Sequence, residues 1–117
     1  GKTTVARGLL RALGVTGTIR SPTYTLLEPY EWQGRTLVHL DLYRLKDETE
    51  LEPLGLRDYP PERCWWLIEW PERTERRLPA PDLAVTLSHD GAGRRAELSR
   101  AAAAATRARL DSSQVKV

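Results

Sequence analysis

The sequence predicts one small α/β domain, and three observations lead to this prediction. The chain has 117 residues, which is enough for a single domain and leaves no room for two. An early segment places apolar residues at helical spacing, whereas several later segments alternate apolar and polar residues or form short apolar runs, as strands do. Hydrophobic residues make up 40% of the chain, which supports one core of modest size.

A helix is predicted first, over residues 3–13, because an apolar stripe recurs at every third or fourth position from Val5 to Leu13. Gly14 follows where a C-terminal cap is expected. The segment Ser21-Pro22-Thr23 then interrupts regular structure, since a residue that precedes proline is disfavoured in the helical conformation.

Strands are predicted next at residues 25–32 and 35–43, joined by a turn at Gln33-Gly34. A short acidic helix is expected at residues 46–54. Residues 63–70 contain the most apolar run of the chain, and they are therefore predicted to form a buried central strand.

The last third of the chain is predicted to contain a hairpin and a helix. Residues 83–88 and 94–99 alternate well enough to form two strands around a turn. Residues 101–110 are rich in alanine and have high helix propensity. The domain is accordingly expected to span residues 1–110, with residues 111–117 as a loose tail.

Composition narrows the classes of function. The 18 basic and 16 acidic residues leave a net charge of +2, far from the dense positive charge of an autonomous nucleic-acid binder. Cys64 is the single cysteine, which excludes a disulfide within the chain and a multi-cysteine metal site. No apolar stretch approaches the ~18 residues of a membrane span, so no membrane association is expected and a cytoplasmic location is the default expectation.

The first candidate site is Gly1-Lys2-Thr3-Thr4 at the start of the predicted helix. A phosphate-binding P-loop needs glycines whose neighbouring backbone N–H groups cradle phosphates, a lysine that reaches the β- and γ-phosphates, and a hydroxyl that binds Mg²⁺. The positive end of the helix adds to this attraction. The alternative is an ordinary helix start with Thr3 or Thr4 as its cap.

The visible motif is incomplete. Only the last three positions of the pattern GxxxxGK[ST] are present, and a bare GK[ST] is expected by chance in roughly one chain of this length in twenty. The helix that follows directly favours the phosphate interpretation. Because the chain has no Met and opens on Gly1, we expect the preceding strand and most of the phosphate loop to be missing.

Two carboxylates close predicted strands. Asp41 ends the apolar segment that starts at Leu37, which is the Walker B arrangement for holding Mg²⁺, although an Asp that caps a loop is the alternative. His39 shares a strand face with Asp41, and a structural role is favoured for it. Glu69 closes the most buried strand, where an unpaired carboxylate is costly, so it should pair with a metal or with an arginine.

These carboxylates are expected to meet. In open α/β sheets, ligands gather at the carboxyl ends of the strands, so Asp41 and Glu69 should lie together beside the phosphate loop. Residues 21–26 carry three aliphatic hydroxyls around a proline and suit a loop that orders over a γ-phosphate, although a plain polar loop is the alternative. Tyr30 is a candidate partner contact, unless it packs under the sheet.

Together these segments resemble the TsaE (YjeE) family of bacterial P-loop ATPases. The likeness covers about residues 1–100. It is carried by GKTT at 1–4, SPTYTLLEPY at 21–30, HLDLYRL at 39–45, ELEPLGLRDY at 50–59 and EWPER at 69–73. The SPTYTL and LDLYRL segments are distinctive, since ordinary P-loop ATPases do not share them.

The resemblance implies a P-loop NTPase-like mixed sheet flanked by helices. It also implies a weak ATPase that uses ATP and Mg²⁺ and is needed to make threonylcarbamoyladenosine on ANN-decoding tRNAs. The implied partners are TsaD and TsaB, the pair that transfers the threonylcarbamoyl group. The resemblance implies only an indirect association with tRNA, through these partners.

The resemblance also implies roles for individual residues. Within the visible end of the phosphate loop, Gly1 and Lys2 would bind phosphates. Thr3 would ligate Mg²⁺, and Thr4 would support the nucleotide or its hydrolysis.

Further along the chain, Asp41 would be the Walker B-like carboxylate and Glu69 a further Mg²⁺ ligand. Trp70 would lie close to the nucleotide pocket, and Gly93-Arg94 would border the base. Residues 21–26 would be the switch-like loop.

Other functions stay open on the sequence. A GTPase would carry an N-K-x-D segment, which this chain lacks, and no arginine-rich kinase lid stands out, although another small P-loop NTPase or kinase is an alternative. A non-hydrolysing module that binds nucleotide and a partner is the alternative of a different class. Paired carboxylates favour hydrolysis over that module, and slow ATP turnover would separate the two.

Overall fold

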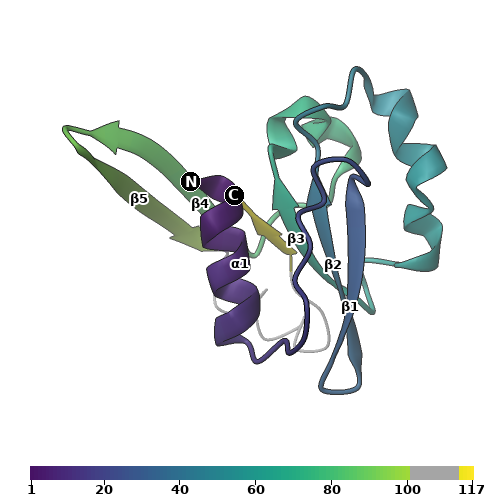
Figure 1. The fold of residues 1–117 in the computed structure, drawn as a ribbon. Helices are drawn as coiled ribbons and strands as arrows, with labels where there is room; N and C mark the ends of the chain where they lie inside the picture. Colours follow the sequence, from purple (N-terminus) through teal and green to yellow (C-terminus); the bar gives the residue numbers. More distant parts are fainter. Residues whose placement is uncertain (101–113) are drawn as a thin grey trace.

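The computed structural model describes residues 1–100 and 114–117 (Figure 1). It is a mixed α/β fold built on one six-stranded sheet with the strand order β1-β2-β3-β6-β4-β5. The elements are α1 (Lys2–Ala12), β1 (Leu27–Trp32), β2 (Arg35–Asp41), the 3₁₀ turns η1 (Glu48–Leu54) and η2 (Leu56–Asp58), β3 (Trp65–Glu69), the 3₁₀ turns η3 (Pro71–Arg73) and η4 (Glu75–Arg77), β4 (Leu83–Asp90), β5 (Gly93–Arg100) and β6 (Gln114–Lys116).

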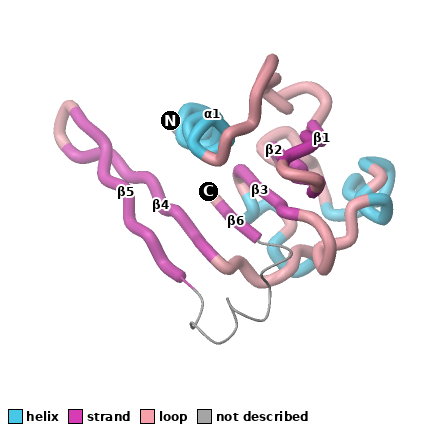
Figure 2. Tube along the Cα trace, turned by 90° about the horizontal axis from the view of Figure 1, so that it is seen from below, coloured by secondary structure: helices cyan, strands magenta, loops and turns pink. Residues whose placement is uncertain are grey.

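Helix α1 confirms the predicted helix and covers one face of the sheet (Figure 2). Ala6 and Leu10 are fully buried against that face, as the apolar stripe requires. Gly14 follows the helix with a φ of +91°, in the left-handed region that glycine enters without steric penalty. The short turns η1 and η2 cover the opposite face through a second apolar cluster.

The hairpin of β1 and β2 also confirms the prediction. Its turn residues Gln33 and Gly34 both have positive φ, 49° and 74°, and this turn geometry matches the twist of antiparallel strands. Strand β1 starts at Leu27 rather than at residue 25. Leu26 has a φ of 65°, which is not an extended conformation, so the strand cannot include it.

Strand β3 is the buried central strand that the sequence predicts. It pairs in parallel with β2 on one side and with β6 on the other. Alternate residues of β2 and β3 enter the two clusters: Val38 and Ile68 pack on the η1 side, whereas Leu37 and Leu67 pack on the α1 side. This alternation places Asp41 and Glu69 on the α1 side of the sheet.

The predicted loose tail is wrong for residues 114–117. Strand β6 lies in the middle of the sheet, between β3 and β4 and parallel to both. Val115 and Val117 are buried in the α1-side cluster. The backbone N–H of Val117 donates to the Ile68 carbonyl in β3, and the Val117 carbonyl accepts from the N–H of Trp70 just after that strand. The segment is too short for a periodic pattern, so its pairing depends on the surrounding sheet.

The remaining elements agree with the predictions where they are described. The acidic segment begins with a capping box at Asp47 and is a 3₁₀ helix that ends at Gly55. Strands β4 and β5 form the predicted hairpin, each longer than predicted. The helix expected at residues 101–110 lies outside the described residues. Among the described helices, none has the length and apolar character needed to cross a membrane.

Candidate functional site

The N-terminus of α1 lies at the carboxyl ends of the central strands. The Thr3 hydroxyl donates a hydrogen bond of 2.8 Å to Oε1 of Glu69, although the two residues are 66 positions apart. Gly1 is the N-cap and makes no side-chain cap hydrogen bond, and the first turn of the helix has no acidic residue. The positive end of α1 therefore faces the edge where the sequence predicts a site.

Glu69 is the most constrained polar residue of this edge. It is fully buried, and its second oxygen, Oε2, lies 2.7 Å from Nε2 of His39. Within the described part of the chain its hydrogen-bond partners are thus Thr3 and His39, not one of the arginines. Both carboxylate oxygens are engaged, as a buried carboxylate requires.

Asp41 lies on the neighbouring strand, in register with Glu69. Parallel strands point registered side chains to the same face, so the two carboxylates share the α1 side of the sheet. Oδ1 of Asp41 accepts a hydrogen bond from the backbone N–H of Tyr43 at 3.1 Å, which caps the loop after β2. The capping alternative is therefore also realised, and one of the two oxygens already serves the loop.

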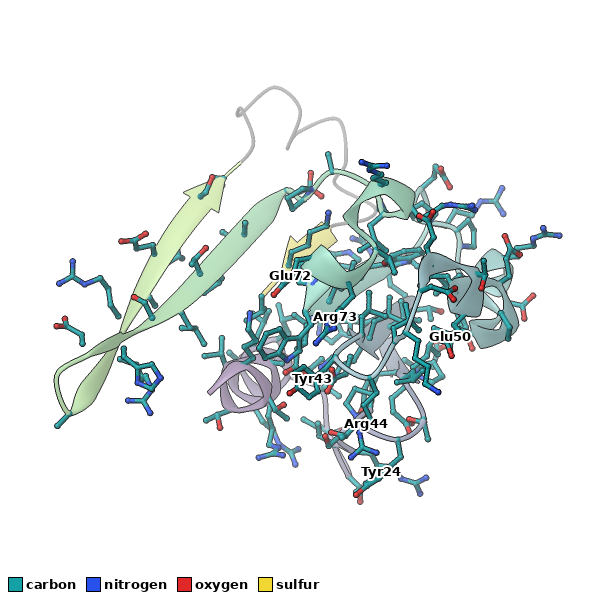
Figure 3. The ribbon with its side chains drawn as sticks, turned by 90° about the horizontal axis from the view of Figure 1, so that it is seen from above. Tyr24, Tyr43, Arg44, Glu50, Glu72 and Arg73 are labelled. Carbon is teal, nitrogen blue, oxygen red and sulfur yellow. The ribbon has the colours of Figure 1, made fainter. Side chains whose placement is uncertain are left out.

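Cationic and aromatic side chains form a row beside these carboxylates. The Lys2 ammonium lies 4.6 Å from the ring centroid of Trp70, and the Trp70 ring lies 4.8 Å from that of Tyr43. The Arg73 guanidinium lies 5.3 Å from the centroid of the Tyr43 ring, and Figure 3 shows these two residues next to each other. Trp70 has a φ of 58°, which is unusual for a bulky residue and typical of functional sites.

A groove of about 450 Å³ adjoins Lys2 and Trp70. Residues Val85–Leu87 of β4 line its other side. The structure does not bring Gly93 and Arg94 to this groove. They lie at the tip of the β4–β5 hairpin, which projects away from the rest of the sheet (Figure 1).

The loop at residues 21–26 touches the end of β2. The Leu26 carbonyl accepts a hydrogen bond from the backbone N–H of Asp41 at 3.1 Å, which ties the loop to the backbone of a candidate carboxylate. Tyr24 is 81% exposed, and Arg44 lies 4.5 Å from its ring centroid (Figure 3). Hydroxyls of Ser21 and Thr23 bond each other at 2.7 Å.

Tyr30 is half-buried rather than fully exposed, as in the packed alternative. Its hydroxyl bonds the backbone N–H and carbonyl of Arg20, and its ring packs against the α1-side cluster. The exposed aromatic residues near the site are instead Tyr24 and Tyr43. Tyr43 follows the Asp41 strand end, so its position after a predicted site carboxylate was the signal that sequence reasoning passed over.

The oxygen donors at this edge fit Mg²⁺. A hydroxyl on Thr3 and carboxylates on Glu69 and Asp41 are hard ligands of the kind that Mg²⁺ prefers. Among the described residues no group of three His, Cys, Asp or Glu side chains could hold a metal ion alone. Mg²⁺ usually takes one or two carboxylates and completes its shell with phosphate and water oxygens, which is consistent with this donor set.

Comparison with known proteins identifies the family. A family profile described as "Threonylcarbamoyl adenosine biosynthesis protein TsaE" matches residues 1–97. The chain is 45% identical over 98 residues to the tRNA threonylcarbamoyladenosine biosynthesis protein TsaE of Haemophilus influenzae, which covers 84% of this chain and 62% of the relative. It is 36% identical over 91 residues to the protein of the same name from Bacillus subtilis, covering 78% and 56%.

The fold and these contacts define an α/β protein with a polar site at the carboxyl edge of parallel strands, facing a helix N-terminus. The chain belongs to the TsaE family, as its sequence segments indicated. It spans about 62% of the length of the Haemophilus influenzae relative and 56% of the Bacillus subtilis one.

Proposed function

We propose that the whole protein is a weak P-loop ATPase that serves tRNA threonylcarbamoyladenosine biosynthesis in the cytoplasm. The hydrogen bond between Thr3 and Glu69 is the observation that carries this proposal. It joins the hydroxyl that directly follows Gly1-Lys2 to a buried carboxylate at the end of the central strand. Relatives named for this biosynthesis supply the pathway.

The hydroxyl geometry explains how Thr3 would act. Because its proton points to Glu69, the oxygen lone pairs of Thr3 remain free to face a cation. Mg²⁺ bound there would neutralise charge on the transferred phosphoryl group. Lys2 would leave the Trp70 face and reach the phosphates, as its long flexible side chain permits.

The two carboxylates would have different duties. Glu69 would hold Thr3 and the Mg²⁺ shell, because its oxygens are both fixed. Asp41 would ligate Mg²⁺ or its water and report to the loop at residues 21–26 through its backbone. Thr4 is exposed at the first turn, where its hydroxyl and N–H can support the nucleotide.

The groove beside Lys2 and Trp70 would receive the nucleotide. Its cationic and aromatic side suits phosphates and a base, and the apolar residues of β4 give it a second wall. A module that binds nucleotide without hydrolysis is the competing function. Two buried carboxylates at one edge favour hydrolysis, since they exceed what phosphate binding needs.

A substitution pair tests the proposed activity in the whole protein. Glu69→Gln keeps the size of the side chain and removes the charge, whereas Glu62→Gln makes the same change at an exposed residue that precedes β3 and lies outside the groove. We expect Glu69→Gln to lower the rate of Mg²⁺-dependent ATP hydrolysis by about 100-fold or more, and the control to stay within about twofold. Thermal melting verifies that both variants are folded.

Unchanged hydrolysis in folded Glu69→Gln protein would refute the assigned role. Nucleotide binding without any hydrolysis by the wild-type protein and its partners would instead support the non-hydrolysing module. Threonylcarbamoyladenosine content of tRNA, measured by mass spectrometry in cells that depend on each variant, links the activity to the pathway.

We further propose that TsaD and TsaB dock on the surface made by Tyr24, Tyr43, Arg44 and Arg73. Each tyrosine ring is stacked with an arginine, and both tyrosines are exposed. Tyrosine and arginine are the residue types that dominate binding energy at protein interfaces. The loop at residues 21–26 supplies Tyr24 and is hydrogen-bonded to Asp41, so the nucleotide state would alter docking.

A further inference from the structure

The buried imidazole of His39 has no role in the proposed mechanism. His39 is 1% exposed, lies on β2, and presents Nε2 to Oε2 of Glu69 at 2.7 Å. Its other ring nitrogen, Nδ1, is buried and has no hydrogen-bond partner among the described residues. A histidine that served only to complete a packed polar core would be expected to have both nitrogens satisfied.

The surroundings determine which ring nitrogen donates. The buried carboxylate of Glu69 can only accept, so Nε2 carries the proton in the contact between them. Nδ1 can then remain a bare lone pair, whereas a proton on it would be a buried donor without a partner. The contact is therefore an N–H donor aimed at one specific oxygen of Glu69.

We propose that His39 is a positioning residue for Glu69, and this inference rests on the proposed function. Three elements meet in one chain of hydrogen bonds: Thr3 from α1, Glu69 from β3 and His39 from β2. His39 holds Oε2, and this leaves Oε1 pointing at the Thr3 hydroxyl. Without that hydrogen bond, Glu69 would keep only one of its two side-chain partners, and the Thr3 hydroxyl would lose its fixed orientation toward the proposed cation.

The arrangement matches a general feature of metal sites. Partners of the groups that approach a metal orient those groups, and their removal typically lowers metal affinity or activity by about 10- to 100-fold. His39 would act on the proposed Mg²⁺ site through Glu69, since Glu69 is the carboxylate to which its ring is hydrogen-bonded. A change at His39 should therefore alter the Mg²⁺ dependence of hydrolysis and leave the proposed contacts of Lys2 with phosphates unaffected.

Three variants of the whole protein test this inference. His39→Leu removes the N–H donor and puts an apolar side chain of similar size in its place. His39→Gln keeps an N–H donor near the position of Nε2. His89→Gln, at the exposed second histidine of the chain, is the matched control. Each is assayed for the rate of ATP hydrolysis, for the Mg²⁺ concentration at half-maximal rate, and for ADP affinity in EDTA by titration calorimetry.

We expect His39→Leu to lower the hydrolysis rate and raise the half-maximal Mg²⁺ concentration by about tenfold or more. Its ADP affinity in EDTA should stay within about twofold of wild type, because the phosphate contacts are untouched. His39→Gln should recover most of both losses, and the control should change nothing. Equal losses in the Leu and Gln variants, or normal Mg²⁺ dependence in a folded Leu variant, would overturn the inference.

A measurement on the unmutated protein keeps the inference testable if His39→Leu does not fold. Nitrogen-15 NMR of the histidine rings distinguishes the two neutral tautomers, and we expect the Nε2–H form for His39, with a proton that Glu69→Gln shifts. Finding the Nδ1–H form would overturn the inference by itself. If the wild-type protein lacks Mg²⁺-dependent hydrolysis, the proposed function fails, and the ring spectrum still decides whether His39 donates to Glu69.

Discussion

Strands β2 and β5 are similar in length, with seven and eight residues, and both are recognisable in the sequence as strands. Yet every residue from Leu37 to Asp41 in β2 is buried, whereas every residue of β5 is exposed. Strand β2 has a neighbour on each side and a covering layer on each face, while β5 is the edge strand of a projecting hairpin.

The difference shows where chemistry can be built. A polar group in a buried strand must find partners, so His39, Asp41 and Glu69 are held in fixed positions by other elements. Polar groups on β5 meet water and need no such partners. The side chains near the hairpin tip, at Gly93 and Arg94, are therefore not held in fixed positions by packing against other elements.

The largest expected effect compares the two regions by stability. Leu40→Ala in β2 removes a fully buried side chain and should lower the free energy of unfolding by ~2–5 kcal/mol. Leu98→Ala in β5, at 67% exposure, should change it by less than about 0.5 kcal/mol. Urea denaturation of both variants measures the contrast, and similar losses would show that the hairpin is part of the cooperative core.

The second comparison concerns nucleotide affinity. Lys2→Ala removes a cation beside the groove and should weaken ATP binding of the whole protein by about tenfold or more, since a charged hydrogen bond contributes ~1.5–3 kcal/mol. Arg94→Ala at the hairpin tip should leave the affinity within about twofold. Titration calorimetry decides this, and a large loss for Arg94→Ala would place the hairpin tip at the nucleotide after all.

The third comparison sharpens the distinction between exposed and packed tyrosines. Tyr24→Ala should weaken binding to the TsaD–TsaB pair by ~1–2 kcal/mol while ATP affinity stays intact. Tyr30→Phe should lose only its bonds to Arg20, which lowers stability by ~0.5–1.5 kcal/mol without affecting docking. Pull-down titration and thermal melting separate the two, and unchanged docking by Tyr24→Ala would move the partner face elsewhere.

The smallest effect concerns Cys64, the residue just before the buried strand β3. Burial, and then the negative charge of Glu31, raise the pKa of this thiol. The native thiol should therefore react with iodoacetamide at pH 8 at least about tenfold more slowly than the urea-unfolded chain. Equal rates would mean that this end of β3 opens freely.

The same shift gives a pH dependence of stability. A thiol whose pKa is raised by folding contributes stability that is fully present below its unfolded pKa and is lost as the pH rises through the folded value. A small loss of stability, confined to alkaline pH and absent from Cys64→Ala, is expected in urea denaturation.

The sequence by itself determined the elements whose causes are local. The helical stripe before Gly14, the Gln33-Gly34 turn and the apolar run ending at Glu69 each depend on residues within a few positions of one another. The family was likewise recognised from short sequence segments, and the family profile that matches residues 1–97 confirms it. Even the expectation that Asp41 and Glu69 lie together came from one rule on parallel strands, and the register confirms it.

Only the tertiary structure decided which partners complete the site and the sheet. The contact of Thr3 with Glu69 spans 66 residues, and the contact of His39 with Glu69 spans 30, so no local pattern contains either. The segment at residues 114–117 has too few residues to show a period, yet it lies in the centre of the sheet. The physical reason is common to all three: burial makes unpaired polar groups and strand edges costly, and the partner that relieves the cost is whichever group the fold brings near.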